Sequence, residues 1–307
     1  MSKKILSQFS LANKKSIIVG GAGDLGLAMV EALVEAGSEA VIIDLDDKVF
    51  SICENLKKDG HKVHAIKADV SDRSQIRTSF ESAINILDGK LDVLINSAGI
   101  QRRHPSEVFP EKDWDDVIAI NLEATFFYCQ LAANIMIPNG GGKIVNIASM
   151  MSFFGGITIP AYAASKGGVS QLTKALSNDW ASKGITVNAI APGYMDTQLN
   201  VALINDPVRN AEALNRIPMK RWGNGSDLKG LTVFLSSEAS DYISGTVIPV
   251  DGGYLWHVLV LWRWCHHAGH FGVVCRRRLG SHIAGIQKSR HSAHTDHFVL
   301  LVCCSKK

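Results

Sequence analysis

The chain alternates short β-branched runs with longer amphipathic stretches. Residues 16–19 form a short β-branched run, which is typical of a buried strand. Residues 25–36 repeat apolar side chains at helical spacing. The pattern predicts seven strands, at 16–19, 40–43, 62–68, 91–95, 143–147, 185–190 and 246–248. Because helical stretches separate the strands, we expect an α/β fold, a single Rossmann-type doubly wound parallel sheet of about seven strands with helices on both faces.

The composition changes after residue 254. Of the 32 Lys and Arg and 29 Asp and Glu residues, eight basic and one acidic residue lie in 255–307, which leaves 24 basic and 28 acidic before it. The overall charge of +3 therefore comes from the last segment and gives no argument for nucleic-acid binding. We expect one nucleotide-binding domain over 1–254 and, over 255–307, an atypical basic segment rich in Cys, His and Trp that lies outside the fold.

Three interpretations of the segment 255–307 stay open. It can be an extension without a selected function. It can bind a metal, because Cys265, His266, His267, His270 and Cys275 are suitable ligand types, although their spacing matches no standard zinc pattern. It can also be a basic interaction segment around the arginines at 276–278. In the domain itself we expect no metal site.

We expect no secretory leader at the start of the chain, because no apolar segment follows the first four residues. No run approaches the roughly 18 apolar residues of a membrane span, so we expect no membrane partner. Only Cys53 and Cys129 precede residue 255, and both are expected in the core. Such sparse cysteine use is typical of a reducing compartment and favours the cytoplasm.

Tyr162 and Lys166 are the most informative candidates for chemistry. On a helix, residues four apart share one face, which would place the ammonium beside the phenol. A nearby cation favours the phenolate, so the oxygen could exchange a proton with an alcohol near neutral pH. Ser149 could bond the same substrate oxygen. The alternative is that the spacing arises by chance, with an exposed Lys beside a half-buried Tyr. Oxidation of an alcohol also transfers a hydride, which no side chain can store, so the chemistry needs a cofactor.

A glycine-rich turn between the first strand and the first helix is a candidate cofactor site. Gly21, Gly23 and Gly26 fit the pattern G-x-G-x-x-G, which lets backbone approach a pyrophosphate at a helix N-terminus. Asp44 ends the second strand, where a carboxylate can bind ribose hydroxyls and repel the extra phosphate of NADP. No Arg stands beside it. The sequence therefore favours NAD, although an ordinary turn and a helix N-cap at Asp44 remain alternatives.

Further motifs follow in order over about residues 8–254. The chain contains Asp69-Val70 after the third strand, Asn96-Ser97-Ala98-Gly99 after the fourth, Asn121, and Pro192-Gly193 with Thr197 after the sixth. With the Tyr–Lys pair and the glycine turn, the chain resembles the short-chain dehydrogenase/reductase family.

The resemblance implies a role for each matched residue. In the catalytic set, Tyr162 would be the acid/base, Lys166 would lower its pKa and bind the nicotinamide ribose, Ser149 would orient the reacting oxygen, and Asn121 would hold a proton-relay water. The implied cofactor contacts are Gly20, Gly23, Asp24, Leu25, Gly26, Asp44, Asp69, Val70, Asn96, Ala98, Gly99, Tyr162, Lys166, Pro192, Gly193 and Thr197.

The glycine turn departs from the family pattern Thr-Gly-x-x-x-Gly-x-Gly at two positions. Val19 replaces the Thr, and Asp24 replaces the middle Gly. Asp24 can cap the following helix, but its charge would lie near the cofactor pyrophosphate. We expect this to change cofactor affinity rather than cofactor identity.

Arg102 and Arg103 are candidates for binding the substrate. They follow the loop after the fourth strand, and an Arg fork suits a carboxylate, although a solvated basic pair is the alternative. Segments at 99–103, 112–116, 146–157 and 216–223 look like the branch of the family that acts on sugar acids. The resemblance implies a homotetramer and an anionic, polyhydroxylated substrate under the segment 196–218. The expected contacts are Arg102, Arg103, Ser149, Met151 and Tyr162.

Two other functions stay open. A reductase of a neutral sugar, a polyol or a 3-oxoacyl substrate would use the same catalytic set. A catalytically silent nucleotide-binding protein is conceivable because of Asp24 and the segment 255–307, but the intact catalytic set argues against it.

Overall fold

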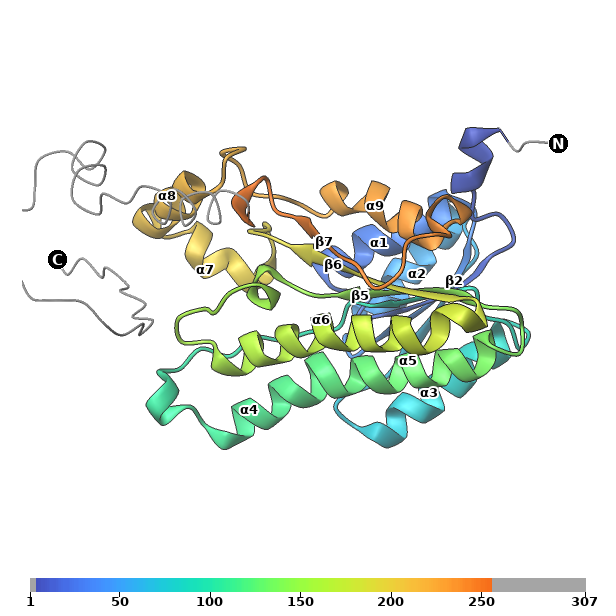
Figure 1. Cartoon of the computed structure of the whole chain (residues 1–307), viewed down its shortest axis with the longest axis horizontal. Helices are drawn as coiled ribbons and strands as arrows, with labels where there is room; N and C mark the ends of the chain where they lie inside the picture. Colours follow the sequence, from blue (N-terminus) through green and yellow to red (C-terminus); the bar gives the residue numbers. More distant parts are fainter. Residues whose placement is uncertain (1–3, 256–307) are drawn as a thin grey trace, which may run out of the picture. The chain divides into compact units, whose positions relative to one another are not determined.

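Seven parallel strands form one sheet in the computed structural model, which describes residues 4–255 (Figure 1). The strand order is β3-β2-β1-β4-β5-β6-β7. The strands are β1 (Lys15–Val19), β2 (Glu39–Asp44), β3 (Val63–Lys67), β4 (Val93–Asn96), β5 (Gly142–Ile147), β6 (Ile185–Pro192) and β7 (Val247–Val250). Each predicted run overlaps one of them, so the predicted doubly wound sheet is confirmed.

Helices connect successive strands, as a parallel sheet requires. Within residues 4–255 the α-helices are α1 (Asp24–Glu35), α2 (Lys48–Lys58), α3 (Arg73–Ile86), α4 (Glu111–Ile118), α5 (Ala124–Met136), α6 (Pro160–Trp180), α7 (Val201–Ile204), α8 (Pro207–Arg216) and α9 (Ser226–Ser236). A π-helical turn, Ala119–Glu123, joins α4 to α5.

The two faces of the sheet carry separate apolar cores because side chains alternate along each strand. On β1, Ile17 points to a core formed with α3, α5 and α6, and Ile18 points to a core formed with α1, α2 and α9. Figure 1 shows these two groups of helices on opposite sides of the sheet. Cys129 and Cys53 are buried, one in each core, as predicted.

The strand order reverses between β1 and β4, and ligands of such sheets bind in the crevice at that point. The turn after β1 and the loop after β4 meet there, where the Ser97 N–H donates to the Val19 carbonyl over 2.8 Å. Gly20 has φ +78°, and a Cβ on it would lie 2.4 Å from the Ala98 nitrogen. Only glycine therefore allows the two segments to approach so closely.

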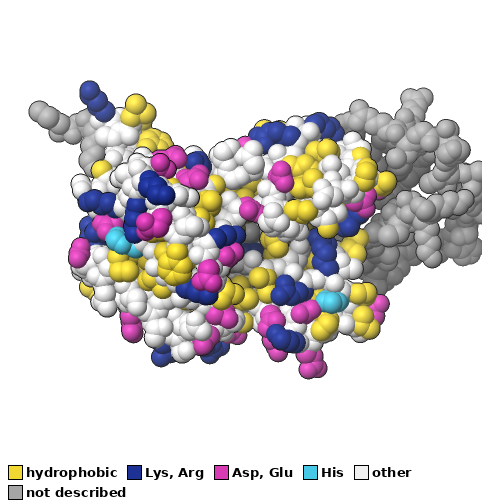
Figure 2. All heavy atoms as spheres, turned by 180° about the vertical axis from the view of Figure 1, so that it is seen from behind, with side chains coloured by type: hydrophobic (Ala, Val, Ile, Leu, Met, Phe, Trp, Pro, Cys, Tyr) yellow, Lys and Arg dark blue, Asp and Glu magenta, His cyan; other side chains and the backbone are white. Residues whose placement is uncertain are grey.

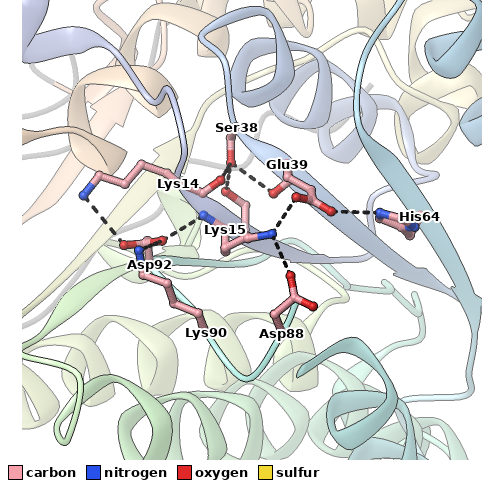
Figure 3. A network of polar contacts seen from close by, with 9 residues as sticks. Lys14, Lys15, Ser38, Glu39, His64, Asp88, Lys90 and Asp92 are labelled. Carbon is pink, nitrogen blue, oxygen red and sulfur yellow. Dashed lines mark hydrogen bonds and ion pairs between the residues drawn. The ribbon is translucent and has the colours of Figure 1, made fainter. Parts of the chain in front are cut away.

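A polar network holds the amino ends of the strands (Figure 3). Lys15 Nζ lies 2.6 Å from Glu39 Oε2, His64 Nε2 lies 3.1 Å from Glu39 Oε1, and the Lys15 N–H donates to Asp92 over 2.8 Å. Burial alone would raise the pKa of the Glu39 carboxyl, but the bonds from Lys15 and His64 outweigh it and lower the pKa. These contacts stabilise the edge of the sheet opposite the carboxyl ends of its strands.

The described surface carries charges of both signs, and Figure 2 shows acidic and basic side chains mixed across one face. In residues 4–255 no helix is long and apolar enough to cross a bilayer, and no three His, Cys, Asp or Glu side chains gather as metal ligands. The predicted boundary at residue 254 stays a prediction, and the candidate ligands and arginines of 255–307 lie outside the described residues.

Candidate active site

Two adjoining cavities open at the carboxyl ends of the strands. One, of about 260 Å³, lies between the glycine turn and α6. The other, of about 550 Å³, lies between the loop after β4, the segment after β5 and α8. Ser149 and Tyr162 line both cavities. The two side chains therefore stand where a molecule in one cavity would meet a molecule in the other.

Tyr162 and Lys166 lie on the first two turns of α6, so their predicted helical spacing is confirmed. Pro160 occupies the first turn, where a missing N–H costs no hydrogen bond. Lys166 Nζ donates to the Ile147 carbonyl over 2.7 Å and lies 5.8 Å from the centroid of the Tyr162 ring. The ammonium is thus fixed beside the phenol by the end of β5.

Burial shifts both groups toward their neutral forms. It lowers the pKa of Lys166 to about 8. It also raises the pKa of the Tyr162 phenol, which a hydrogen bond from Ser149 and the charge of Arg103 oppose. The sequence predicted that Lys166 alone lowers the pKa of Tyr162, and the contribution of Arg103 was missed. The role of Lys166 stays a prediction.

Ser149 is positioned by its own backbone and by α6. It is the N-cap of a short 3-10 turn, and its Oγ accepts the N–H of Met151 over 3.2 Å. Ser152, in the same turn, donates to the carbonyl of Lys166 over 2.6 Å. The turn therefore holds the Ser149 hydroxyl at a fixed place relative to Tyr162.

Asn121 lies in the π-helical turn between α4 and α5 and is fully buried. Its Nδ2 donates to the Ile100 carbonyl over 3.0 Å and to Ser165 Oγ over 3.1 Å, and its Oδ1 accepts the Ile100 N–H over 2.8 Å. A Cβ on Gly99 would lie 3.4 Å from Asn121 Oδ1 and 3.5 Å from Lys166 Nζ. Gly99 therefore keeps open the space between these two polar groups.

The glycine turn fits a nicotinamide dinucleotide. A Cβ on Gly26 would lie 2.0 Å from the Gly20 carbonyl oxygen, so the turn could not close without glycine there. At Gly23 a Cβ would meet only one atom, at 3.7 Å, so its backbone is open to the cavity. The predicted cofactor residues that line the 260 Å³ cavity are Gly20, Gly23, Asp24, Leu25, Gly26, Gly99, Tyr162, Lys166, Pro192, Gly193 and Thr197.

Asp24 does not cap α1, contrary to the expectation from sequence. Gly23 is the N-cap, and Asp24 is the first residue of the helix. The Asp24 carboxylate instead accepts the N–H of Gln198 over 2.8 Å. It thereby joins the glycine turn to the segment after Thr197 across the cavity.

Asp44 braces the glycine turn. Its carboxylate accepts the N–H of Ala22 over 2.9 Å and of Asp46 over 3.0 Å, and the N-cap of α2 is Asp47, so the helix-cap alternative for Asp44 is wrong. Lys48, unlike Asp44, lines the 260 Å³ cavity, and its Nζ lies 3.2 Å from Asp46 Oδ2. Sequence reasoning missed Lys48, whose only signal is its position four residues after Asp44.

Five predicted cofactor residues do not line the 260 Å³ cavity: Asp44, which contacts the glycine turn instead, and Asp69, Val70, Asn96 and Ala98. Asp69 and Val70 follow β3, where Asp69 accepts the N–H of Ser71 over 2.9 Å. Asn96 ends β4, is buried and donates to Asn146 Oδ1 over 2.9 Å, and Ala98 packs against the core. Their contacts with a cofactor stay predictions.

The structure separates the two predicted arginines. Arg103 lines the 550 Å³ cavity together with Met151, as predicted for substrate contacts. Arg102 does not line it, and its Nε lies 3.5 Å from Asp113 Oδ1. Three further charged residues at the cavity, all on α8, were missed from the sequence because only the fold brings them there: Arg209, Glu212 and Arg216.

Comparison with known proteins agrees with this geometry. The sequence profile of the family described as Enoyl-(Acyl carrier protein) reductase matches residues 20–255. A short-chain type dehydrogenase/reductase from Mycobacterium marinum is 30% identical and superposes with a TM-score of 0.77, over 82% of this chain and 99% of that one. The chain belongs to the short-chain dehydrogenase/reductase family. It is therefore an oxidoreductase with a nicotinamide cofactor.

Two relatives within the family carry more specific names. The 2-dehydro-3-deoxy-D-gluconate 5-dehydrogenase of Escherichia coli K12 is 45% identical over 252 residues, which cover 82% of this chain and 99% of the relative. A gluconate 5-dehydrogenase from Burkholderia cenocepacia, solved in complex with NADP and tartrate, is 37% identical with a TM-score of 0.78, over 82% of this chain and 98% of that one. The resemblance to the sugar-acid branch is thus confirmed.

Proposed function

We propose that the protein interconverts a secondary alcohol and a ketone on a sugar acid of the 2-deoxy-D-gluconate or 2-keto-3-deoxygluconate type, with NAD as cofactor. The observation that carries this proposal is the presence of Arg103 in the same cavity as Ser149 and Tyr162. A guanidinium there suits a carboxylate on a substrate whose hydroxyl reaches Tyr162. The names of the two relatives support the same substrate class.

The catalytic side chains act on the substrate oxygen. When bound, a nicotinamide dinucleotide supplies the hydride acceptor or donor. In oxidation the Tyr162 phenolate takes the proton of the substrate hydroxyl, and in reduction the phenol returns it to the forming alkoxide. Ser149 orients that oxygen by a hydrogen bond. Lys166 would bind the ribose of the cofactor, and Asn121 with the Ile100 carbonyl would hold the water that relays the proton.

NAD is proposed because of the charges beside the glycine turn. The carboxylate of Asp44, with Asp46 and Asp47 nearby, would repel the 2′-phosphate of NADP. Lys48 is the opposing charge, and its ammonium is held near Asp46. Because the Burkholderia relative contains NADP, the ratio of kcat/KM for the two cofactors is the deciding measurement.

The substrate class can be tested by a dehydrogenase screen of sugar acids against their neutral alcohol counterparts. Arg103→Ala should lower kcat/KM for the acid by roughly 10- to 150-fold, because a hydrogen bond to a charged group contributes about 1.5–3 kcal/mol. The neutral counterpart should lose much less, because it loses only the effect of the Arg103 charge on the pKa of Tyr162. Arg102→Ala is the matched control, since Arg102 pairs with Asp113 and does not line the cavity. Equal losses on both substrates would contradict the assignment of Arg103.

We also propose a homotetramer and a cytoplasmic location. The first follows from the family resemblance, and sedimentation of the purified protein would test it. The second follows from the cysteine usage of the domain, and fractionation of the source cells would test it.

A further inference from the structure

One face of α8 carries three charged, exposed side chains that the proposed catalytic residues do not explain. Arg209, Glu212 and Arg216 are spaced i, i+3 and i+7, which places them on one face of the helix. All three line the 550 Å³ cavity that also contains Arg103 and Tyr162. The helix therefore presents two guanidinium groups and one carboxylate to the space beside the acid/base.

The fold holds this face in place. Ala213, in the last turn of α8, is 4% exposed, and Ile217, just beyond the helix, is 1% exposed. The Trp222 indole N–H donates to Asn210 Oδ1 over 2.8 Å. At the other end, the Asp206 side chain accepts the N–H groups of Val208 and Arg209. α8 is thus anchored at both ends and along its apolar side, so the charged residues keep a defined position.

Among residues 4–255, two of the three charged side chains have no partner. Arg216 hydrogen-bonds the Tyr254 hydroxyl. The guanidinium of Arg209 and the carboxylate of Glu212 form no hydrogen bond or ion pair within residues 4–255, although they stand three residues apart on one helix. A guanidinium only donates hydrogen bonds and a carboxylate only accepts them, and a hydroxyl can do both. A donor next to an acceptor matches neighbouring hydroxyl groups of a polyol.

We propose that Arg209 and Glu212 bind the hydroxylated end of the substrate, remote from its carboxylate, and that α8 thereby selects substrates by length. The inference rests on the proposed function, in which Arg103 takes the carboxylate and Tyr162 the reacting oxygen. The cavity of about 550 Å³ is within the range of about 300–1,000 Å³ usual for small-molecule sites, which leaves room for further hydroxylated carbons.

The test compares a six-carbon sugar acid with a homologous acid that lacks the terminal hydroxylated carbons. Arg209→Ala and Glu212→Ala should each lower kcat/KM for the long acid by roughly 10- to 100-fold and for the short acid by less than about twofold. The loss should appear mainly in KM. Asn215→Ala is the matched control, because Asn215 is exposed on α8 and does not line the cavity.

Each outcome is decisive. Equal losses on the long and short acids would mean that the two residues only support α8, and no loss on either would mean that they do not contact substrate; both results would overturn the inference. If the wild-type enzyme oxidises no sugar acid, the proposed function itself is wrong, which is seen before any variant is made.

Discussion

Lys166→Met should make the enzyme more stable and abolish its turnover. Lys166 is 4% exposed, and its burial lowers its pKa to about 8 from the usual 10.5. Near neutral pH the folded protein therefore contains a charged ammonium that its surroundings disfavour. A methionine of similar length has no charge to desolvate, so the free energy of unfolding should rise.

The magnitude follows from the pKa. The interval from about 8 to 10.5 corresponds to about 3 kcal/mol of unfolding free energy. Loss of the bond from Lys166 Nζ to the Ile147 carbonyl, 2.7 Å long, should cost about 1 kcal/mol. The net gain is about 2 kcal/mol at pH 7. For a domain of roughly 150–250 residues this raises Tm by about 4–8 °C.

The pH dependence gives the sharper assay. Between pH 8 and 10.5 the unfolded chain holds a proton on Lys166 that the folded chain has released, so wild-type stability rises with pH over that window. Below pH 8 Lys166 is charged in both states, so the full cost of burying its charge lowers the free energy of unfolding. The stability of Lys166→Met does not rise with pH in this window. Its unfolding free energy, about 2 kcal/mol above that of the wild type at pH 7, should therefore nearly equal the wild-type value at pH 9.5. Urea unfolding of both proteins at pH 7 and pH 9.5 would measure the difference.

Lys174→Met is the matched control, because Lys174 is exposed on the same helix. This variant should show no pH-dependent difference from wild type. A Lys166→Met protein that is less stable than wild type at pH 7, with a difference that does not change at pH 9.5, would refute the reasoning.

Three other results are expected. Tyr162→Phe should lower turnover by at least about 10²-fold and leave NADH binding intact by fluorescence titration; near-normal turnover would exclude Tyr162 as the acid/base. Asp44→Ala should narrow the preference for NAD over NADP in kcat/KM, and a wild-type enzyme that already prefers NADP would contradict the interpretation of Asp44. A chain ending at Leu255, which is 5% exposed, should match the full chain in solubility and turnover, and loss of either would give residues 256–307 a role.

The sheet could be predicted from sequence because most of its inner strands, such as β1 and β4, are buried on both faces and read as nearly continuous apolar runs. The run 16–19 and the strand Lys15–Val19, for example, differ by one residue. The Tyr162–Lys166 pair was equally predictable, since its geometry depends only on the helix that contains it.

Features that depend on contacts between distant segments could not be predicted. Arg102 and Arg103 are adjacent and chemically identical, and only the packing of their loop turns one toward the cavity. The partner of Asp24 lies 174 residues away. The face formed by Arg209 and Glu212 is visible in the helical spacing, but nothing in that spacing places it in the same cavity as Tyr162.

The hydrogen bond between Asp24 and Gln198 has a consequence for the order of events in a catalytic cycle. The segment that begins at Gln198 continues through Leu199 and Asn200, which line both cavities. We expect a dinucleotide to pass this segment freely only before a substrate fills the second cavity and fixes the segment. Cofactor should therefore bind first and leave last. Departure of the used cofactor would then require the Asp24 contact to open, and we expect that step to limit the turnover rate.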